Sequence, residues 1–311
     1  MEFVLDFLFG PLKEIWEFPT FFVEVVVGGV LSGVMYSLVA LGFVLIFKAS
    51  GVFNFAQGAM VLCAALTFVG FIDLGAPVWL AMIGALATMI ALAFAIERVV
   101  LRPLVNQAPI ILFMATIGIS YFIDGLFQSI WGEDVKRLDI GIPKDPIEIA
   151  GVLINTFDIV AALVAGALVA TLAFFFQSTR IGRALRAVAD DHQAAQSVGI
   201  PLQTIWVIVW SVAGIVALVA GIMWGSKLGV QFSLAFVALK ALPVLILGGF
   251  TSIPGAIIGG LIIGVGEKVA EVFWAAKIGG GIEDWFAYML ALFFLMFRPQ
   301  GLFGERIIER V

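Results

Sequence analysis

The sequence predicts an all-α protein that spans a membrane about eight or nine times, with some of its helices broken. Its 311 residues are 62% hydrophobic and only 13% charged. A soluble chain would carry about 25% charged residues. The apolar residues also occur in long runs, and a bilayer core needs about 20 of them in each helix. The expected architecture is therefore a polytopic transmembrane helix bundle.

Nine apolar segments are candidates for the membrane spans. They are residues 22–47, 55–73, 77–97, 108–131, 152–177, 203–225, 233–250, 254–273 and 284–298. The seventh and eighth are separated by Gly248, Gly249 and Pro254, residues that disfavour a continuous helix. These two segments are expected either as two full helices or as a broken, re-entrant pair. The preceding segment, 1–21, is acidic with an apolar face, which predicts an interfacial helix rather than a cleaved signal peptide.

The arginines predict the orientation of the spans, because cytoplasmic loops are enriched in positive charge. All but Arg137 fall on loops that alternate to one side, namely Arg98, Arg102, Arg180, Arg183, Arg186, Arg298, Arg306 and Arg310. The C-terminus, with the tail 305–311, is therefore expected in the cytoplasm and the acidic N-terminus outside. Residues 22–304 are expected to form one transmembrane domain, since no polar insert is long enough for a soluble one.

Composition also excludes several functions. The net charge is -5 and no basic face accumulates, which argues against nucleic acid as a partner. Cys63 is the only cysteine and His192 the only histidine, so disulfides, zinc sites and Ser-His-Asp catalysis lack their residues. No Gly-rich phosphate-binding loop occurs, so the chain is not expected to hydrolyse a nucleotide. We do not expect an enzyme.

A charged amphipathic segment, residues 182–198, lies between two long apolar spans. It is expected to be one helix that ends at Gly199, with Pro201 just beyond. One interpretation is a helix that contacts a protein outside the membrane. The alternative is a solvated loop that merely follows the positive-inside rule.

Five segments together carry a family resemblance. They are Asn54-Phe55-Ala56-Gln57-Gly58, Ile96 to Leu104, Ala115 to Ser120, Lys240 to Leu242 with Leu247 to Gly260, and the charged segment 182–198. The chain resembles, from residue 30 to residue 304, the permeases of branched-chain amino acid ABC importers, specifically the Liv-type subunit.

This resemblance implies a permease subunit in the bacterial inner membrane that forms a translocation path. It implies four kinds of partner: a second, related permease, two cytoplasmic ATPases, a periplasmic binding protein and the lipid bilayer. ATP would be bound by the ATPases, so no cofactor is expected in this chain. The implied cargo is a branched-chain or other hydrophobic amino acid, or a small solute such as urea, an amide or an organic acid.

The resemblance also implies that 182–198 is a cytoplasmic coupling helix docked on an ATPase. The residues expected to carry this contact are Arg183, Arg186, Asp190, Asp191, Ala195 and Gly199.

The residues expected along the substrate path are Asn54, Gln57, Lys240 and Ser252. Gln57 departs from the family pattern, which usually has histidine there, and Ala59 replaces a glutamate. Asn54 and Gln57 lie at the start of the second predicted span, where free N–H groups of a helix N-terminus suit a carboxylate. Simple helix capping by Asn54 is the alternative, and the two roles are compatible.

Lys240 and Asp124 are ionisable groups inside predicted spans, where such groups usually face the interior of a bundle. Pairing between them stays open, as does snorkelling of Lys240 to the outer interface. An alternative function, ion-coupled secondary transport, would use Asp124 and Asp158 as its buried carboxylates. Glycines spaced four apart favour close helix packing instead of a site, as at Gly29/Gly33, Gly255/Gly259 and Gly260/Gly264.

Overall fold

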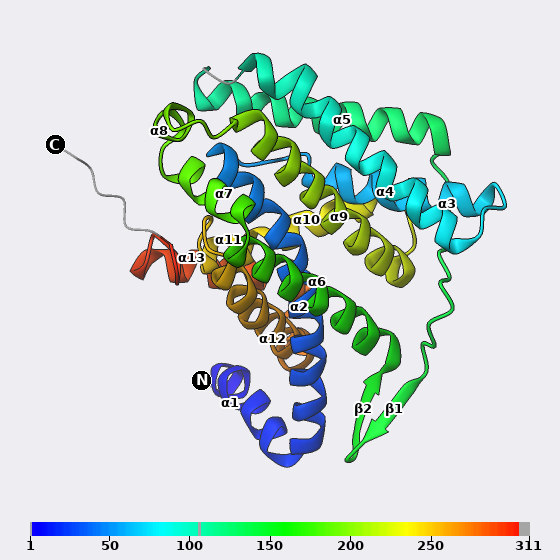
Figure 1. Cartoon of the computed structure of the whole chain (residues 1–311). Helices are drawn as coiled ribbons and strands as arrows, with labels where there is room; N and C mark the ends of the chain where they lie inside the picture. The colour runs from blue at the N-terminus through cyan, green and yellow to red at the C-terminus, as the bar shows by residue number, and fades with distance from the viewer. Residues whose placement is uncertain (1, 105–106, 305–311) are drawn as a thin grey trace. The chain divides into compact units, whose positions relative to one another are not determined.

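The computed structural model describes residues 2–104 and 107–304 (Figure 1). The chain forms two compact units, each assembled from separate stretches of sequence. The first unit is Met1–Ser37, Gly141–Gly166 and Lys240–Val311, and the second is Leu38–Ile140 and Ala167–Leu239. The predicted cytoplasmic tail, 305–311, lies outside the described residues.

Almost all of the secondary structure is helical. The α-helices are α1 Glu2–Glu17, α2 Pro19–Ser50, α3 Gln57–Asp73, α4 Val78–Ala95, α5 Pro109–Trp131, α6 Thr156–Ser178, α7 Arg180–Asp190, α8 His192–Ser197, α9 Leu202–Leu228, α10 Val237–Lys240, α11 Leu242–Gly248, α12 Ile253–Ile278 and α13 Ile282–Phe297. A π-helix η1 and two 3-10 helices, η2 and η3, cover Ile96–Leu101, Arg102–Leu104 and Phe232–Phe236.

The helices confirm a polytopic membrane protein. In the described part of the chain, five helical runs are long and apolar enough to cross a bilayer: α2, Val78–Leu104, α5, α6 and α9. A sixth span results if Phe232–Gly248 and Ile253–Lys277, which are bent by 114° at a short break, count as one. Shorter apolar helices cover Gln57–Asp73 and Trp285–Phe297. Each of the nine predicted segments overlaps a helix, and the predicted count of eight or nine spans is approximate.

The core of the second unit is α3, which packs against α4, α5 and α9 (Figure 1). Every residue of α3 from Gln57 to Gly70 is buried, as expected for a helix that is apolar all round. Gly221 of α9 makes the α3–α9 approach possible, since a Cβ there would lie 2.6 Å from the carbonyl oxygen of Val61. The segment that begins with Gln57 is thus held on all sides by other helices.

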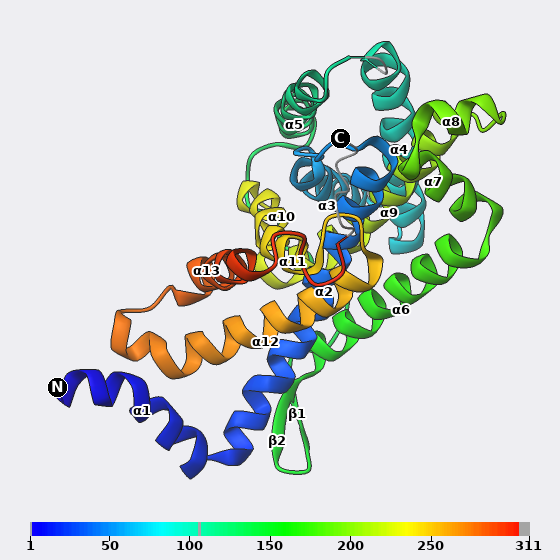
Figure 2. The same ribbon diagram turned by 90° about the vertical axis from the view of Figure 1, so that its left-hand side faces the viewer.

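In the first unit, α12 packs against α11, α13 and α1 (Figure 2). The glycine pairs act as packing surfaces, as predicted. A Cβ added to Gly29 of α2 would lie 2.7 Å from the Cα of Val265 on α12. A Cβ added to Gly33 would lie 2.6 Å from the carbonyl oxygen of Gly260 on the same helix. Bare backbone at these positions lets two membrane helices cross closely.

Two local predictions require correction. The polar insert contains a hairpin, in which β1 (Pro146–Ile149) pairs antiparallel with β2 (Val152–Asn155). Its turn is formed by Ala150 and Gly151, both with positive φ, a geometry that closes tight hairpins. The fifth span therefore begins at Thr156 and not at residue 152. The helix of the N-terminal segment ends at Glu17, and α2 begins at Pro19.

Candidate functional site

The turn before α3 contains the two predicted path residues of the second unit. Asn54 and Gln57 are both completely buried. The Oδ1 atom of Asn54 accepts the N–H of Ala56 at 3.0 Å, and its main-chain carbonyl accepts the N–H of Gln57 at 3.3 Å. Asn54 therefore closes the turn that leads into α3, but the N-cap residue of that helix is Ala56 and no side chain caps it, so the capping interpretation is wrong.

Gln57 has one side-chain atom that the protein does not satisfy. Its Oε1 accepts the Nδ2–H of Asn54 at 3.4 Å. Its Nε2 is buried and has no hydrogen-bond partner among the described residues. That nitrogen faces Gly42 of α2, where an added Cβ would lie 2.6 Å away. A buried donor without an acceptor costs about 1–3 kcal/mol, so this amide is suited to bind an acceptor from outside the protein.

Thr116 of α5 joins this turn, although sequence reasoning gave it no role. Its Oγ1 accepts the N–H of Phe55 at 3.3 Å and donates to the carbonyl of Phe113 at 2.8 Å. The hydroxyl therefore links α5 to the turn. The signal in the sequence was the segment Ala115 to Ser120, which carried the family resemblance without indicating a contact.

Four phenylalanines form a continuous row along the same turn. Phe43 stacks on Phe53 with ring centroids 4.7 Å apart, and Phe53 meets Phe55 edge-on at 4.8 Å. Phe55 in turn meets Phe113 of α5 at 5.0 Å. The turn thus combines one unsatisfied amide donor with an aromatic surface, a combination suited to a small molecule with a polar head and an apolar body.

Lys240, in the first unit, is paired with carboxylates of that unit. Its ammonium lies 3.3 Å from Oε1 of Glu283 and 3.6 Å from Oε1 of Glu267. The Glu267 side chain is almost completely buried and also accepts the hydroxyl of Tyr36 at 2.9 Å. Within its own unit, Lys240 thus pairs with two glutamates, Glu267 of α12 and Glu283 of α13. Asp124 has one buried carboxylate oxygen for which the described part of the chain provides no hydrogen-bond partner.

The charges around Lys240 form a network. Lys268 of α12 also pairs with Glu283, at 3.2 Å, and the carboxylate of Glu271 accepts the N–H of Glu283 at 3.0 Å. The ammonium of Lys240 is thus compensated within the protein, as charges inside a membrane require.

Ser252, the fourth predicted path residue, lies at the break between α11 and α12. Its Oγ accepts the N–H of Gly255 at 3.0 Å and so caps α12. The preceding Gly249 has φ 104, a left-handed conformation that favours glycine. The paired glycines therefore break the helix, as their sequence predicted.

The charged segment 182–198 forms two helices instead of one. Asp191 lies between α7 and α8 in an extended conformation, and its Oδ1 accepts the N–H groups of Gln193 and Ala194 at 2.8 and 3.0 Å. The prediction of one continuous helix is wrong at this residue, because Asp is a strong N-cap and starts a new helix here. Gly199, with φ 85, follows the end of α8.

The predicted coupling residues of this segment have different environments. Arg186 donates to the carbonyls of Phe176 and Gln177, and Arg183 donates to that of Ser178, so both cap the end of α6. Ala195 is buried, with 3% of its surface exposed, whereas Asp190 is exposed. Val198 is 75% exposed, which is unusual for a large apolar side chain beside a polar helix. Arg183, Arg186, Asp191 and Gly199 are exposed as well.

The chain is similar to known transport proteins over nearly its whole length. It matches the family described as branched-chain amino acid transport system / permease component over residues 25–297. The high-affinity branched-chain amino acid transport system permease protein BraD of Pseudomonas aeruginosa is 30% identical over 306 residues, which cover 93% of this chain and 98% of that protein. Its counterpart LivH of Escherichia coli K12 is 29% identical over 314 residues, 94% and 98% of the two chains.

A solved structure, that of PsaBC from Streptococcus pneumoniae in complex with Fab, is 13% identical and covers 86% of this chain and 89% of that chain, with a TM-score of 0.46. The family match extends over residues 25–297 and therefore includes the buried turn, the Lys240 network and the charged segment. The resemblance that the motifs indicated is confirmed, and the chain belongs to the family of branched-chain amino acid transport system permease components.

Proposed function

We propose that the chain is the transmembrane permease subunit of an ATP-driven importer for branched-chain or other hydrophobic amino acids, or for related small solutes. The family match over residues 25–297 carries this proposal. It is supported by two relatives, named as high-affinity branched-chain amino acid permeases, that are aligned with 93% and 94% of the chain. The match also favours ATP-driven import over ion-coupled transport through Asp124 and Asp158. The proposed location is the bacterial inner membrane.

The buried turn before α3 is proposed as part of the substrate path. A hydrophobic amino acid presents a carboxylate and an apolar side chain together. The unsatisfied amide of Gln57 is a donor suited to the carboxylate, while the row from Phe43 to Phe113 is suited to the side chain. Ser252 and Lys240 are retained as path residues of the first unit.

The proposed partners are a second, related permease, two cytoplasmic ATPases and a periplasmic binding protein. ATP would be bound by the ATPases, which α7 and α8 would contact through Asp190 and Val198. Residues 22–304 would form the permease domain, with 1–21 on the membrane surface.

Reconstitution tests the proposal most simply. Proteoliposomes that contain all the partners should take up radiolabelled leucine only with ATP, whereas the chain alone should show no uptake with ATP or with an ion gradient. Uptake by the isolated chain, driven by protons or sodium, would overturn the proposal and turn attention to Asp124.

The coupling contact has its own test, in the substitution Val198→Asp. A charge at this exposed apolar position should remove the ATPases from the purified complex while the permease still inserts and folds. The matched control is Val135→Asp, the same change at a side chain that is 61% exposed and predicted on the opposite side. Retention of the ATPases by Val198→Asp would count against docking through α8.

A further inference from the structure

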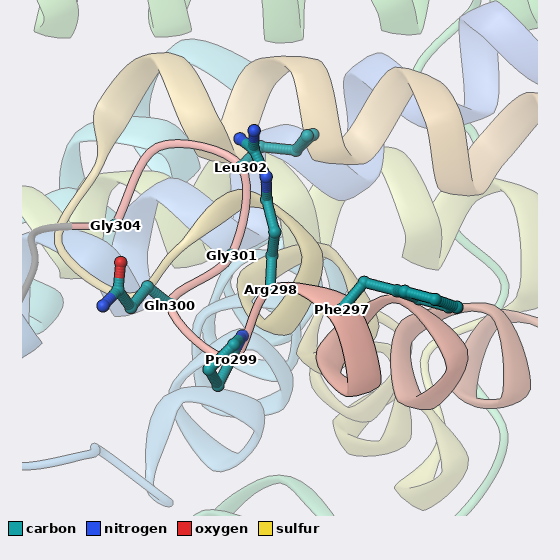
Figure 3. A pocket seen from close by; sticks show the side chains of 7 residues that line it. All are labelled: Phe297, Arg298, Pro299, Gln300, Gly301, Leu302 and Gly304. Carbon is teal, nitrogen blue, oxygen red and sulfur yellow. The ribbon is translucent and has the colours of Figure 1, made fainter.

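The last described residues of the chain form a hook, Arg298–Gly304, that returns to the helix break of the first unit. Figure 3 shows this loop with the side chains of Arg298, Pro299 and Gln300. The residues of the loop line a hollow of about 450 Å³. Gly301 and Gly304 are among the lining residues, so the main chain of the hook borders this hollow as well as contacting α11.

Two main-chain hydrogen bonds join the hook to the end of α11. The N–H of Leu302 donates to the carbonyl of Leu247 at 2.8 Å, and the N–H of Phe303 donates to that of Gly248 at 3.1 Å. The last carbonyls of a helix have no partner within the helix. The hook satisfies two of them, although more than fifty residues separate it from α11 along the chain.

Glycines leave no free space between the hook and the break. A Cβ on Gly301 would lie 2.7 Å from the main-chain nitrogen of Gly249 and 2.9 Å from its Cα. A Cβ on Gly249 would lie 2.8 Å from the nitrogen of Gly304. Gly249 and Gly301 are both buried and both have positive φ, at 104° and 78°. The main chain of the hook therefore contacts the main chain at the break directly, and no flexible side chain lies between them that could move aside.

This contact fixes the part of the chain that carries Ser252. The carbonyl of Gly249 accepts the N–H of Ser252 at 3.3 Å, and Ser252 then caps α12 through Gly255. The position of the cap thus depends on the conformation of Gly249, which the hook sets. We propose that the hook is a clamp on the break between α11 and α12, and that Gly301 is a positioning residue for transport. The transport part of this inference rests on the proposed function, whereas the clamp itself does not.

Exchange of amide hydrogens in the unaltered protein tests the clamp without any transport measurement. In the complete transporter, the N–H groups of Leu302 and Phe303 should exchange as slowly as that of Gly249, which bonds to Leu245 within α11. Exchange at the hook that is about tenfold or more faster than at Gly249 would overturn the clamp, because the two would then open independently.

The substitution Gly301→Ala tests the positioning role. Its matched control is Gly280→Ala, because Gly280 has φ 86 but nothing within 4 Å of an added Cβ. Both variants strain the backbone, yet only Gly301→Ala pushes Gly249 away. Uptake by the complete transporter should fall about tenfold in Gly301→Ala and stay close to wild type in Gly280→Ala.

A second readout separates positioning from loss of fold. In a Cys63→Ala background, the thiol reaction rate of Ser252→Cys should change at least about threefold on adding Gly301→Ala and stay unchanged on adding Gly280→Ala. Equal uptake and equal thiol rates in the two glycine variants would overturn the positioning role. If the unaltered transporter and both glycine variants all failed to take up substrate, the proposed function would be contradicted. Slow exchange at the hook would still support the clamp in that case.

Discussion

Two buried polar side chains, Glu267 in the first unit and Gln57 in the second, differ in whether the protein satisfies them. In the first unit, Lys240 and Glu267 are satisfied by one another, by Glu283 and by the hydroxyl of Tyr36. In the second unit, Gln57 keeps a buried amide nitrogen for which the described residues provide no acceptor. A satisfied network holds helices together, whereas an unsatisfied donor costs stability unless something else binds it. We propose from this difference that Glu267 holds helices together and that Gln57 contacts the substrate.

The largest effect on stability is expected in the charged network. Glu267→Ala removes a nearly fully buried carboxylate that contacts Lys240 and Tyr36. The ammonium of Lys240 then lacks one of its two carboxylate partners. Breaking such a pair costs about 3–5 kcal/mol, so the melting temperature of the purified complex should drop strongly. Glu133→Ala, at an exposed carboxylate, serves as the control. Equal melting of the two variants would mean that the network is not structural.

A smaller loss is expected at the turn before α3. Asn54→Ala removes the side-chain acceptor of Ala56 N–H and should cost about 1–2 kcal/mol in unfolding free energy. Uptake should fall as well, because this turn positions Gln57. In the control, Asn155→Ala removes a hydrogen bond of the same kind, from Phe157 N–H at 2.9 Å, at the exposed end of β2. If both variants reduce uptake equally, the turn has no special role.

The smallest effect is expected at the contact between the turn and α5. Thr116→Val keeps the shape of the side chain but removes the acceptor of the Phe55 N–H, at a cost of about 1 kcal/mol. A modest decrease in uptake should accompany it. Thr88→Val, which removes only a bond to Gly84 within α4, should change uptake less. A larger decrease in uptake in Thr88→Val than in Thr116→Val would contradict a functional role for the contact between the turn and α5.

Much of the fold could be predicted from the sequence, because apolar runs and glycine spacing are local signals. The runs located nine helical segments, and the spacing of Gly29 and Gly33 indicated a close helix crossing. The break at Gly248 and Gly249 was also recognisable, since two glycines weaken a helix wherever they occur. By contrast, the amphipathic pattern around Asp191 predicted one continuous helix. In the structure Asp191 is an N-cap that starts a second helix, so this prediction was wrong.

The candidate site was less predictable, because its contacts join residues far apart in the chain. Asn54 and Gln57 were found through a family motif, but their hydrogen bonds depend on the buried position of α3. Thr116 contacts the turn only because α5 packs against α3. Lys240 was recognised as an intramembrane charge, yet its partner Glu283 is 43 residues away. Composition and periodicity carry no information about such pairs.

The substitution Gln57→Leu tests the contrast between the two units most directly. Leucine keeps most of the volume and removes both the unsatisfied donor and the acceptor of Asn54 Nδ2–H at 3.4 Å. Because these two effects oppose each other, the unfolding free energy should change by no more than about 2 kcal/mol. ATP-dependent uptake of leucine by the complete transporter should nevertheless fall at least about tenfold, since the donor would no longer reach the substrate. Gln128→Leu, the same change in α5, should leave uptake unchanged. Wild-type uptake by Gln57→Leu, or a stability loss as large as that of Glu267→Ala, would contradict the assignment of Gln57 to the substrate path.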